Sequence, residues 1–186
     1  MIQKAACEIT QSADVLQLFR AERDHLAVIS PFFATYCKTQ SSTVCLELFR
    51  APEPLVDIAG VLRDKPVARQ TMRCAELHNN AEHEFYVQGE VGSVGKLYLL
   101  RISSLDAVSG NAVTVLLTSD HRRIRGHVHC LSAGAVQEPF GLMAHVGYAE
   151  ETVPSPVPPG LLISPVTQCN LKLYPLYLAR HAQNCD

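Results

Sequence analysis

The sequence predicts an all-β fold in which antiparallel strands form a β-sandwich. Over most of the chain, short apolar segments recur with Gly, Pro, Asn and Ser between them, and these residues favour turns. The segment Thr43–Phe49 alternates at period two, so that Val44, Leu46 and Leu48 share one face of a strand. Only one short stretch, residues 70–77, has a plausible helical pattern. This combination favours a sandwich over a βαβ fold.

Seven segments carry the strand pattern most clearly, because they are rich in the aliphatic and aromatic residues that favour strands. In chain order they are residues 15–19, 26–29, 32–36, 43–49, 84–88, 96–102 and 112–117, with further strand-like patterns at 124–131 and 140–148. Between the two strongest strands, Gly110 and Asn111 can adopt positive φ and predict a turn. The residues expected in the core are Leu18, Ile29, Phe33, Leu46, Leu48, Leu99, Val113 and Val115.

A change in composition near residue 150 predicts a domain boundary. Residues 152–160 contain four prolines in nine positions, and proline fixes φ and removes a backbone donor. Such a segment favours an extended spacer over a strand inside a sheet. We therefore expect a β-sandwich domain at residues 1–150, a Pro-rich spacer at 151–160 and a short tail at 161–186.

The overall composition limits the classes of function. The chain has 186 residues, 47% of them hydrophobic, and a formal net charge of -2, so a core can form and a nucleic-acid partner is not expected. The basic run at residues 121–125 is short enough to be a solvated turn. No stretch approaches the roughly 20 apolar residues of a membrane span, and no signal peptide is recognisable. Seven cysteines without a framework spacing favour reduced thiols in a cytoplasmic protein.

Several segments carry the pattern of a known class of modules. They are Gln17–Phe19, Leu26–Ile29 leading to Thr35 and Tyr36, Val44–Leu48, Gly92–Tyr98 running into Ile102–Ser104, and Asp106 and Ala107 with Gly110–Thr114. Residues 15–118 thereby resemble the β-sandwich accessory module found beside bacterial glycosyltransferases and other surface-polysaccharide enzymes. The resemblance implies a jelly-roll-like domain and raises carbohydrate binding by analogy. The chain has no Trp, and most of its six Tyr and six Phe lie in strand patterns, which leaves few candidates for an exposed aromatic platform.

A second resemblance follows the proline-rich segment. Residues 160–171, an apolar strand leading into Cys169-Asn170-Leu171, resemble the opening of radical S-adenosylmethionine enzymes. That family holds a four-iron, four-sulfur cluster on three cysteines spaced C-x3-C-x2-C. Here the second and third positions are Leu173 and Leu176, and leucine cannot bind iron. Cys169 is then a remnant cluster position, and the tail looks like a truncated, degenerate enzyme start.

Histidines and one cysteine supply weaker metal alternatives. Cys74, His78 and His83 form a Cys-x3-His-x4-His spacing, and His127 and His129 lie two residues apart on an expected strand. Zinc accepts these ligand types, but neither group has a fourth ligand at a recognised spacing. The sequence carries no nucleophile elbow, phosphate loop or dinucleotide fingerprint.

These observations predict a non-catalytic β-sandwich accessory module that binds glycan or a partner protein, in the setting of surface-polysaccharide biosynthesis. No catalytic residue, cofactor, metal or membrane span is expected. The alternative is a fragment of a radical S-adenosylmethionine enzyme that has lost its cluster ligands.

Overall fold

The computed structural model describes residues 3–55, 57–119, 128–131 and 140–149. All of them belong to one compact unit, which spans residues 1–150. The predicted spacer and tail, and with them Cys169, lie outside the described residues.

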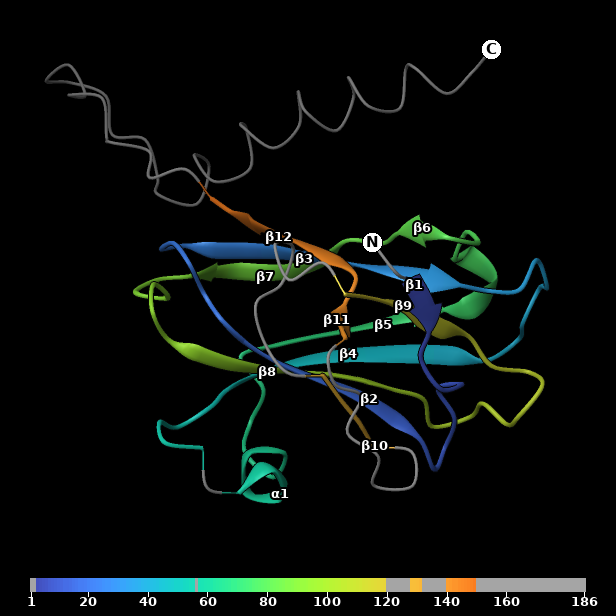
Figure 1. Cartoon of the computed structure of the whole chain (residues 1–186), viewed down its shortest axis with the longest axis horizontal. Helices are drawn as coiled ribbons and strands as arrows, with labels where there is room; N and C mark the ends of the chain where they lie inside the picture. Colours follow the sequence, from blue (N-terminus) through green and yellow to red (C-terminus); the bar gives the residue numbers. More distant parts are fainter. Residues whose placement is uncertain (1–2, 56, 120–127, 132–139, 150–186) are drawn as a thin grey trace, which may run out of the picture. The chain divides into compact units, whose positions relative to one another are not determined.

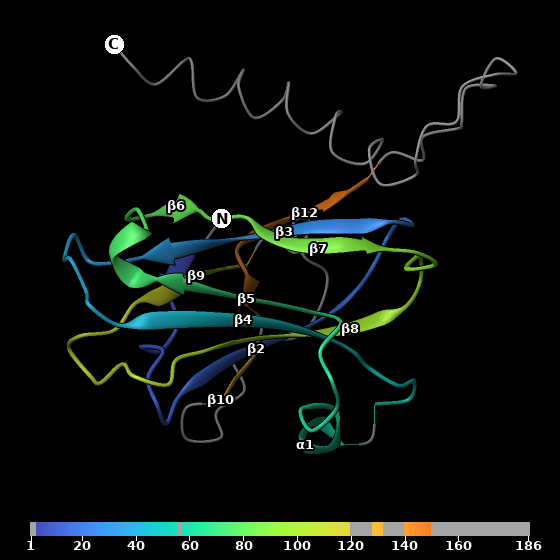
Figure 2. The same cartoon turned by 180° about the vertical axis from the view of Figure 1, so that it is seen from behind.

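Two antiparallel sheets pack face to face, which confirms the predicted all-β sandwich (Figure 1). The first sheet contains β1 (Gln3–Ala5), β3 (Leu26–Ala34), β6 (Ala81–Glu82), β7 (Phe85–Glu90), β9 (Thr114–Thr118), β11 (Gly141–Leu142) and β12 (Ala144–Tyr148). The second sheet contains, in spatial order, β10 (Val128–Leu131), β2 (Asp14–Arg20), β8 (Leu97–Ser103), β4 (Thr43–Arg50) and β5 (Ala68–Arg73). Seen from behind, the same two layers lie one over the other (Figure 2).

The strand pairing is nested in the manner of a jelly roll. β4 pairs with β5, β3 with β7, β2 with β8 and β1 with β9, all antiparallel. Successive nested pairs alternate between the second and the first sheet. A long hairpin folded over itself in this way is the jelly-roll arrangement of two stacked antiparallel sheets.

The segment that carries β11 and β12 departs from the simple jelly roll by entering the first sheet between β3 and β9. β11 pairs with β9, and the chain then crosses so that β12 pairs with β3. Met143 stands at the crossing: its N–H donates to the carbonyl of Leu116 at 2.8 Å, and its carbonyl accepts from the N–H of Phe32 at 3.0 Å. The β11–β12 segment therefore connects β3 to β9 beyond the two positions at which these strands pair directly.

The structure corrects two of the expected elements. The two strands expected at 26–29 and 32–36 are one strand, β3. The helix expected at 70–77 is wrong: these residues form β5 and a 3-10 turn, η1 (Cys74–Glu76). β5 alternates in exposure along its length and pairs with β4 through six residue positions. Long-range pairing at the sheet edge thus overrides the local pattern, and the one α-helix among the described residues, α1 (Ile58–Val61), lies elsewhere.

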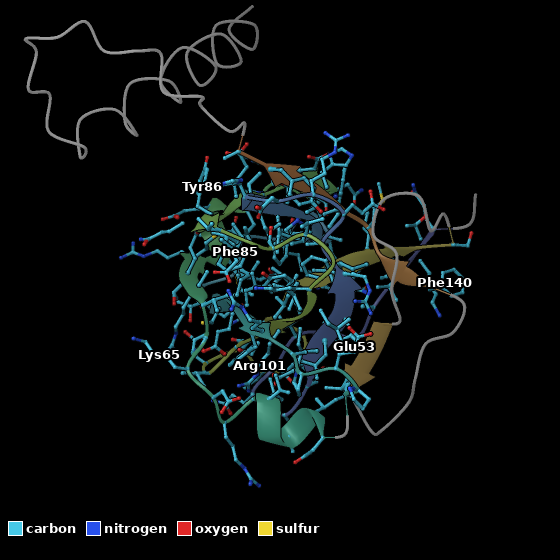
Figure 3. All side chains as sticks on the ribbon, turned by 90° about the vertical axis from the view of Figure 1, so that its left-hand side faces the viewer. Glu53, Lys65, Phe85, Tyr86, Arg101 and Phe140 are labelled. Atoms are coloured by element: carbon cyan, nitrogen blue, oxygen red, sulfur yellow. The ribbon has the colours of Figure 1, made fainter. Side chains whose placement is uncertain are left out.

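Side chains of both sheets fill the space between them. Six of the eight predicted core residues are buried in this cluster: Ile29, Phe33, Leu46, Leu48, Val113 and Val115. Phe85 and Tyr86 illustrate the alternation on β7, since Phe85 is fully buried and Tyr86 lies at the surface (Figure 3). The pattern predicted for Thr43–Phe49 is confirmed, because Val44, Leu46 and Leu48 all face the core.

The other two predicted core residues belong to a second apolar cluster. Leu99 is buried and Leu18 is half-buried, but both pack with Leu16 and Phe49 on the outer face of the second sheet. The segment between β4 and β5, which carries α1, folds over this face and covers it with Leu55, Ile58, Val61 and Leu62. These strands carry apolar residues on both faces because both faces are buried, one by the first sheet and the other by the α1 segment.

Two glutamines connect the sheets. Gln17 of β2 is fully buried, and its side-chain oxygen accepts from the N–H of Leu142 in the first sheet at 2.8 Å. Gln70 of β5 accepts from the N–H of Tyr86 at 3.2 Å and donates to the carbonyl of Glu84 at 3.4 Å. Backbone N–H and C=O groups need hydrogen-bond partners. The two glutamine side chains provide such partners for the N–H groups of Leu142 and Tyr86 and for the carbonyl of Glu84. Within the described ranges, no helix has the length and apolar character needed to cross a bilayer.

Candidate functional site

Among the predicted metal ligands that the structure describes, the two histidines of the 74–83 segment lie together. The rings of His78 and His83 stack with centroids 5.9 Å apart. The backbone N–H of His78 donates to Nε2 of His83 at 2.9 Å, so one nitrogen of that ring is already occupied. Burial, together with the neighbouring His78, lowers the pKa of His83 and so favours the neutral form of its ring.

Cys74 does not join the histidines as a ligand. Its side chain is buried in the main core, and burial raises the pKa of the thiol, which opposes formation of the thiolate that binds metals. Among the side chains that the structure describes, no three His, Cys, Asp or Glu gather as metal ligands would. His129 lies on β10 opposite Leu16 of β2, and His127 lies outside the described residues.

A turn next to these histidines has an uncommon backbone conformation. Tyr36 and Cys37 follow β3 with φ of 55° and 57°, a region that residues other than glycine rarely occupy. Asn79 holds the turn: its side-chain oxygen accepts from the N–H of Thr35 at 2.9 Å, and its amide donates to Sγ of Cys37 at 3.2 Å. These bonds explain how the turn is maintained, and they place Asn80 at the adjoining edge of the first sheet.

The outer face of the first sheet contains a surface depression of about 370 Å³. We call it the Phe32 depression; it is lined by Gln3, Lys4, Ala5, Phe32, Asn80, Leu116 and Met143. Its floor follows one row across the sheet, because Ala5 pairs with Leu116, and Met143 bonds to both Leu116 and Phe32. Asn80, with φ of 55°, reaches the row from the turn before β6.

Polar and charged groups surround the aromatic ring of this depression. The ring of His145 meets Phe32 edge-on with centroids 6.0 Å apart, and Nδ1 of His145 lies 2.9 Å from the carboxylate of Glu82. The ammonium of Lys4 lies 4.1 Å from the ring centroid of Phe140, a cation–π contact on the core-facing side of the sheet, because Lys4 pairs with the buried Leu117. An apolar row with one aromatic ring, amides and charges at its rim has the general character of a small-molecule site.

Sequence reasoning missed Phe32, although a signal was available. Phe32 and Phe33 are adjacent in an expected strand, and side chains alternate between the two faces of a strand. Since Phe33 is a predicted core residue, Phe32 had to face outward. Strand pairing alone then shows that Leu116 and Met143 lie beside it.

The charged groups on the outer face of the second sheet have a structural explanation. Arg101 lies 2.7 Å from Asp14 and 3.5 Å from Glu47, and Glu47 lies 3.6 Å from Arg69. Asp14, Arg101, Glu47 and Arg69 lie on four successive strands, β2, β8, β4 and β5, and their charges alternate in sign. Each of these side chains therefore has a neighbour of opposite charge. Figure 3 shows Arg101 on this sheet, close to the α1 side of the molecule. Cross-strand pairs of this kind stabilise a sheet.

The sequence was compared with models of known protein families and with curated proteins, and neither comparison found a match. The functional assignment therefore depends on the geometry of the Phe32 depression.

Proposed function

We propose that this domain is a non-catalytic carbohydrate-binding module and that the Phe32 depression is its ligand site. The observation that carries the proposal is the placement of one half-buried aromatic ring in a row of apolar residues, with amide side chains at its rim. The flat, apolar face of a sugar ring packs against an aromatic side chain, while its hydroxyl groups need hydrogen-bonding partners around the edge.

The depression is shallow and open, with a volume of about 370 Å³. It therefore offers a surface to one face of a short glycan segment and does not enclose it. The floor is formed by backbone-paired strands, so it is held in place before a ligand arrives. Preformed sites bind with a smaller loss of conformational entropy than sites that must be ordered by the ligand.

The charged groups favour binding without cleavage. Hydrolysis of a glycosidic bond usually requires two carboxyl groups on opposite sides of the bond. In the described surroundings of the depression, Glu82 is the carboxylate next to Phe32, and it is paired with His145. A single carboxylate engaged in this way can orient a ligand, but it does not provide the acid and the base of a hydrolase.

The resemblance of residues 15–118 to accessory modules of surface-polysaccharide enzymes supports a bacterial surface polysaccharide as the glycan. The jelly-roll arrangement is compatible with this role, since the same arrangement occurs in lectin domains, although a fold alone does not assign a function.

An array of bacterial surface polysaccharides, followed by calorimetric titration of the full chain with the bound glycans, tests the proposal. Phe32→Leu removes the flat ring but keeps apolar bulk, and we expect it to weaken binding about tenfold, or ~1.4 kcal/mol. Tyr86→Ala is the matched control, because Tyr86 is a half-exposed aromatic of the same sheet outside the depression. Binding that is equal in Phe32→Leu and the parent chain would overturn the site. An array on which no glycan binds would overturn the proposed carbohydrate function. Binding of a partner protein at this face in place of a glycan would overturn it as well.

A further inference from the structure

Resting on the proposed function, we infer that the Phe32 depression selects sugars that carry an acetamido group. The argument depends on the chemistry of its two sides. Ala5, Leu116 and Met143 form the apolar side, and the carboxamides of Asn80 and Gln3 lie among the lining residues. A hydroxylated sugar can meet the two sides only with separate groups, its C–H face and a hydroxyl, whereas an acetamido substituent carries a methyl group and an amide together.

The apolar side favours a methyl group over a hydroxyl. Ala5 and Leu116 are directly paired across β1 and β9, and Met143 follows in the same row, so these three residues form a continuous strip. A hydroxyl placed against such a strip loses its hydrogen bonds to water without replacement, which is unfavourable. A methyl group in the same position removes apolar surface from water and is stabilised.

Asn80 provides the complementary polar group. Its side chain is exposed and forms no hydrogen bond with the part of the chain that the structure describes. A carboxamide has both donors and an acceptor, so it can donate to the carbonyl of an acetamido group or accept from its N–H. Asn80 is held in position because the preceding residue, Asn79, is bonded to Thr35 and Cys37.

The apolar strip also separates an acetamido sugar from its free amine. A protonated amine placed against Ala5, Leu116 and Met143 would lose its hydration without gaining a partner, whereas an acetamido group is neutral. The site is therefore expected to prefer N-acetylated sugars over both the hydroxylated and the amino forms.

Calorimetric titration of the full chain with matched trisaccharides tests this selectivity. Triacetylchitotriose, cellotriose and chitotriose differ only in the group on C2, and N-acetylgalactosamine with galactose provides the same comparison in the other configuration. We expect the acetamido member of at least one series to bind about tenfold or more tightly than its hydroxyl and amino counterparts. Leu116→Asn and Asn80→Asp should each reduce this ratio at least threefold, and Tyr86→Ala should leave it unchanged.

Equal affinities for the acetamido and hydroxyl members would overturn the selectivity and leave the proposed carbohydrate function intact. Retention of the full preference in both Leu116→Asn and Asn80→Asp would also overturn it. Failure of every oligosaccharide, together with a blank polysaccharide array, would overturn the carbohydrate function itself. Thermal unfolding of each variant shows whether a lost preference reflects the site or loss of the fold.

Discussion

A Cβ atom placed on Gly147 would lie 2.4 Å from Cγ1 of Val28, far inside the contact distance of two carbon atoms. Gly147 and Val28 are paired positions of β12 and β3. The register of β12 shifts immediately after Gly147, so the two strands approach closely at the end of their pairing. β12 can therefore enter the first sheet here only because position 147 has no side chain.

Gly147→Ala should consequently destabilise the domain by about 1–3 kcal/mol, because valine has a stiff χ1 and cannot easily move its methyl group. Denaturant unfolding measures the change. The double variant Gly147→Ala with Val28→Ala removes the clashing methyl group and should recover part of the loss. A Gly147→Ala chain as stable as the parent would show that β12 does not pair with β3 in this way.

Leu46→Ala should cost about 2–5 kcal/mol, because Leu46 is fully buried in the main core and its truncation leaves a cavity. The matched control is Leu105→Ala, since the Leu105 side chain is 75% exposed and its truncation should change stability by less than about 0.5 kcal/mol. Denaturant midpoints of both variants provide the comparison. Similar values for the two would contradict the assignment of Leu46 to the core.

Gln17→Leu should destabilise the domain by about 1–3 kcal/mol even though leucine is apolar and of similar size. The substitution leaves the buried N–H of Leu142 without its acceptor, and an unpaired buried donor is costly. Hydrogen exchange gives a local test, because the amide of Leu142 should exchange faster in the variant. Unchanged protection of that amide would mean that the inter-sheet bond is not formed.

The stability of the domain should depend on His83 as the pH falls. Its pKa is lowered in the folded state, so below about pH 6.5 the unfolded chain takes up a proton before the folded chain does. The parent chain should lose stability from pH 6.5 downward until the folded-state pKa is passed. His83→Gln should flatten this part of the profile, and His78→Gln should flatten it less because burial is the larger cause. Thermal midpoints between pH 7.5 and 5 measure the slopes; parallel profiles for parent and His83→Gln would contradict the prediction.

The chain should neither assemble a four-iron, four-sulfur cluster nor cleave S-adenosylmethionine, because Leu173 and Leu176 stand at two of the three ligand positions of that family. Anaerobic reconstitution with iron and sulfide, followed by visible absorbance and an assay for 5′-deoxyadenosine, provides the measurement. A stoichiometric cluster with any cofactor cleavage would favour the alternative function of an enzyme fragment over a binding module.

The local sequence was sufficient for the strands whose two faces differ in polarity or size. Residues Thr43–Phe49 illustrate this, since period-two alternation placed Val44, Leu46 and Leu48 on the core side without any tertiary information. Gly110 also adopts the positive φ expected of a glycine in a turn. Strand alternation and turn conformation depend on residues that are adjacent in the chain, so the sequence alone is enough to predict them.

Residues 70–77 show where local patterns stop being decisive. The segment became an edge strand and a 3-10 turn because β4 offers it a ladder of hydrogen bonds, and β4 is distant in sequence. Leu18 and Leu99 were expected in the main core, but α1 covers the other side of their sheet and creates a second apolar cluster there. A pattern of apolar residues identifies buried faces without stating what buries them.

Alternation and turn residues act over a few positions, so the local pattern was enough to predict an antiparallel β-sandwich. The row of Ala5, Leu116, Met143 and Phe32, with Asn80 at its edge, could not be predicted in this way. Those residues come from segments spread between positions 5 and 143, and strand register, which depends on long-range pairing and on the close approach at Gly147, brings them together.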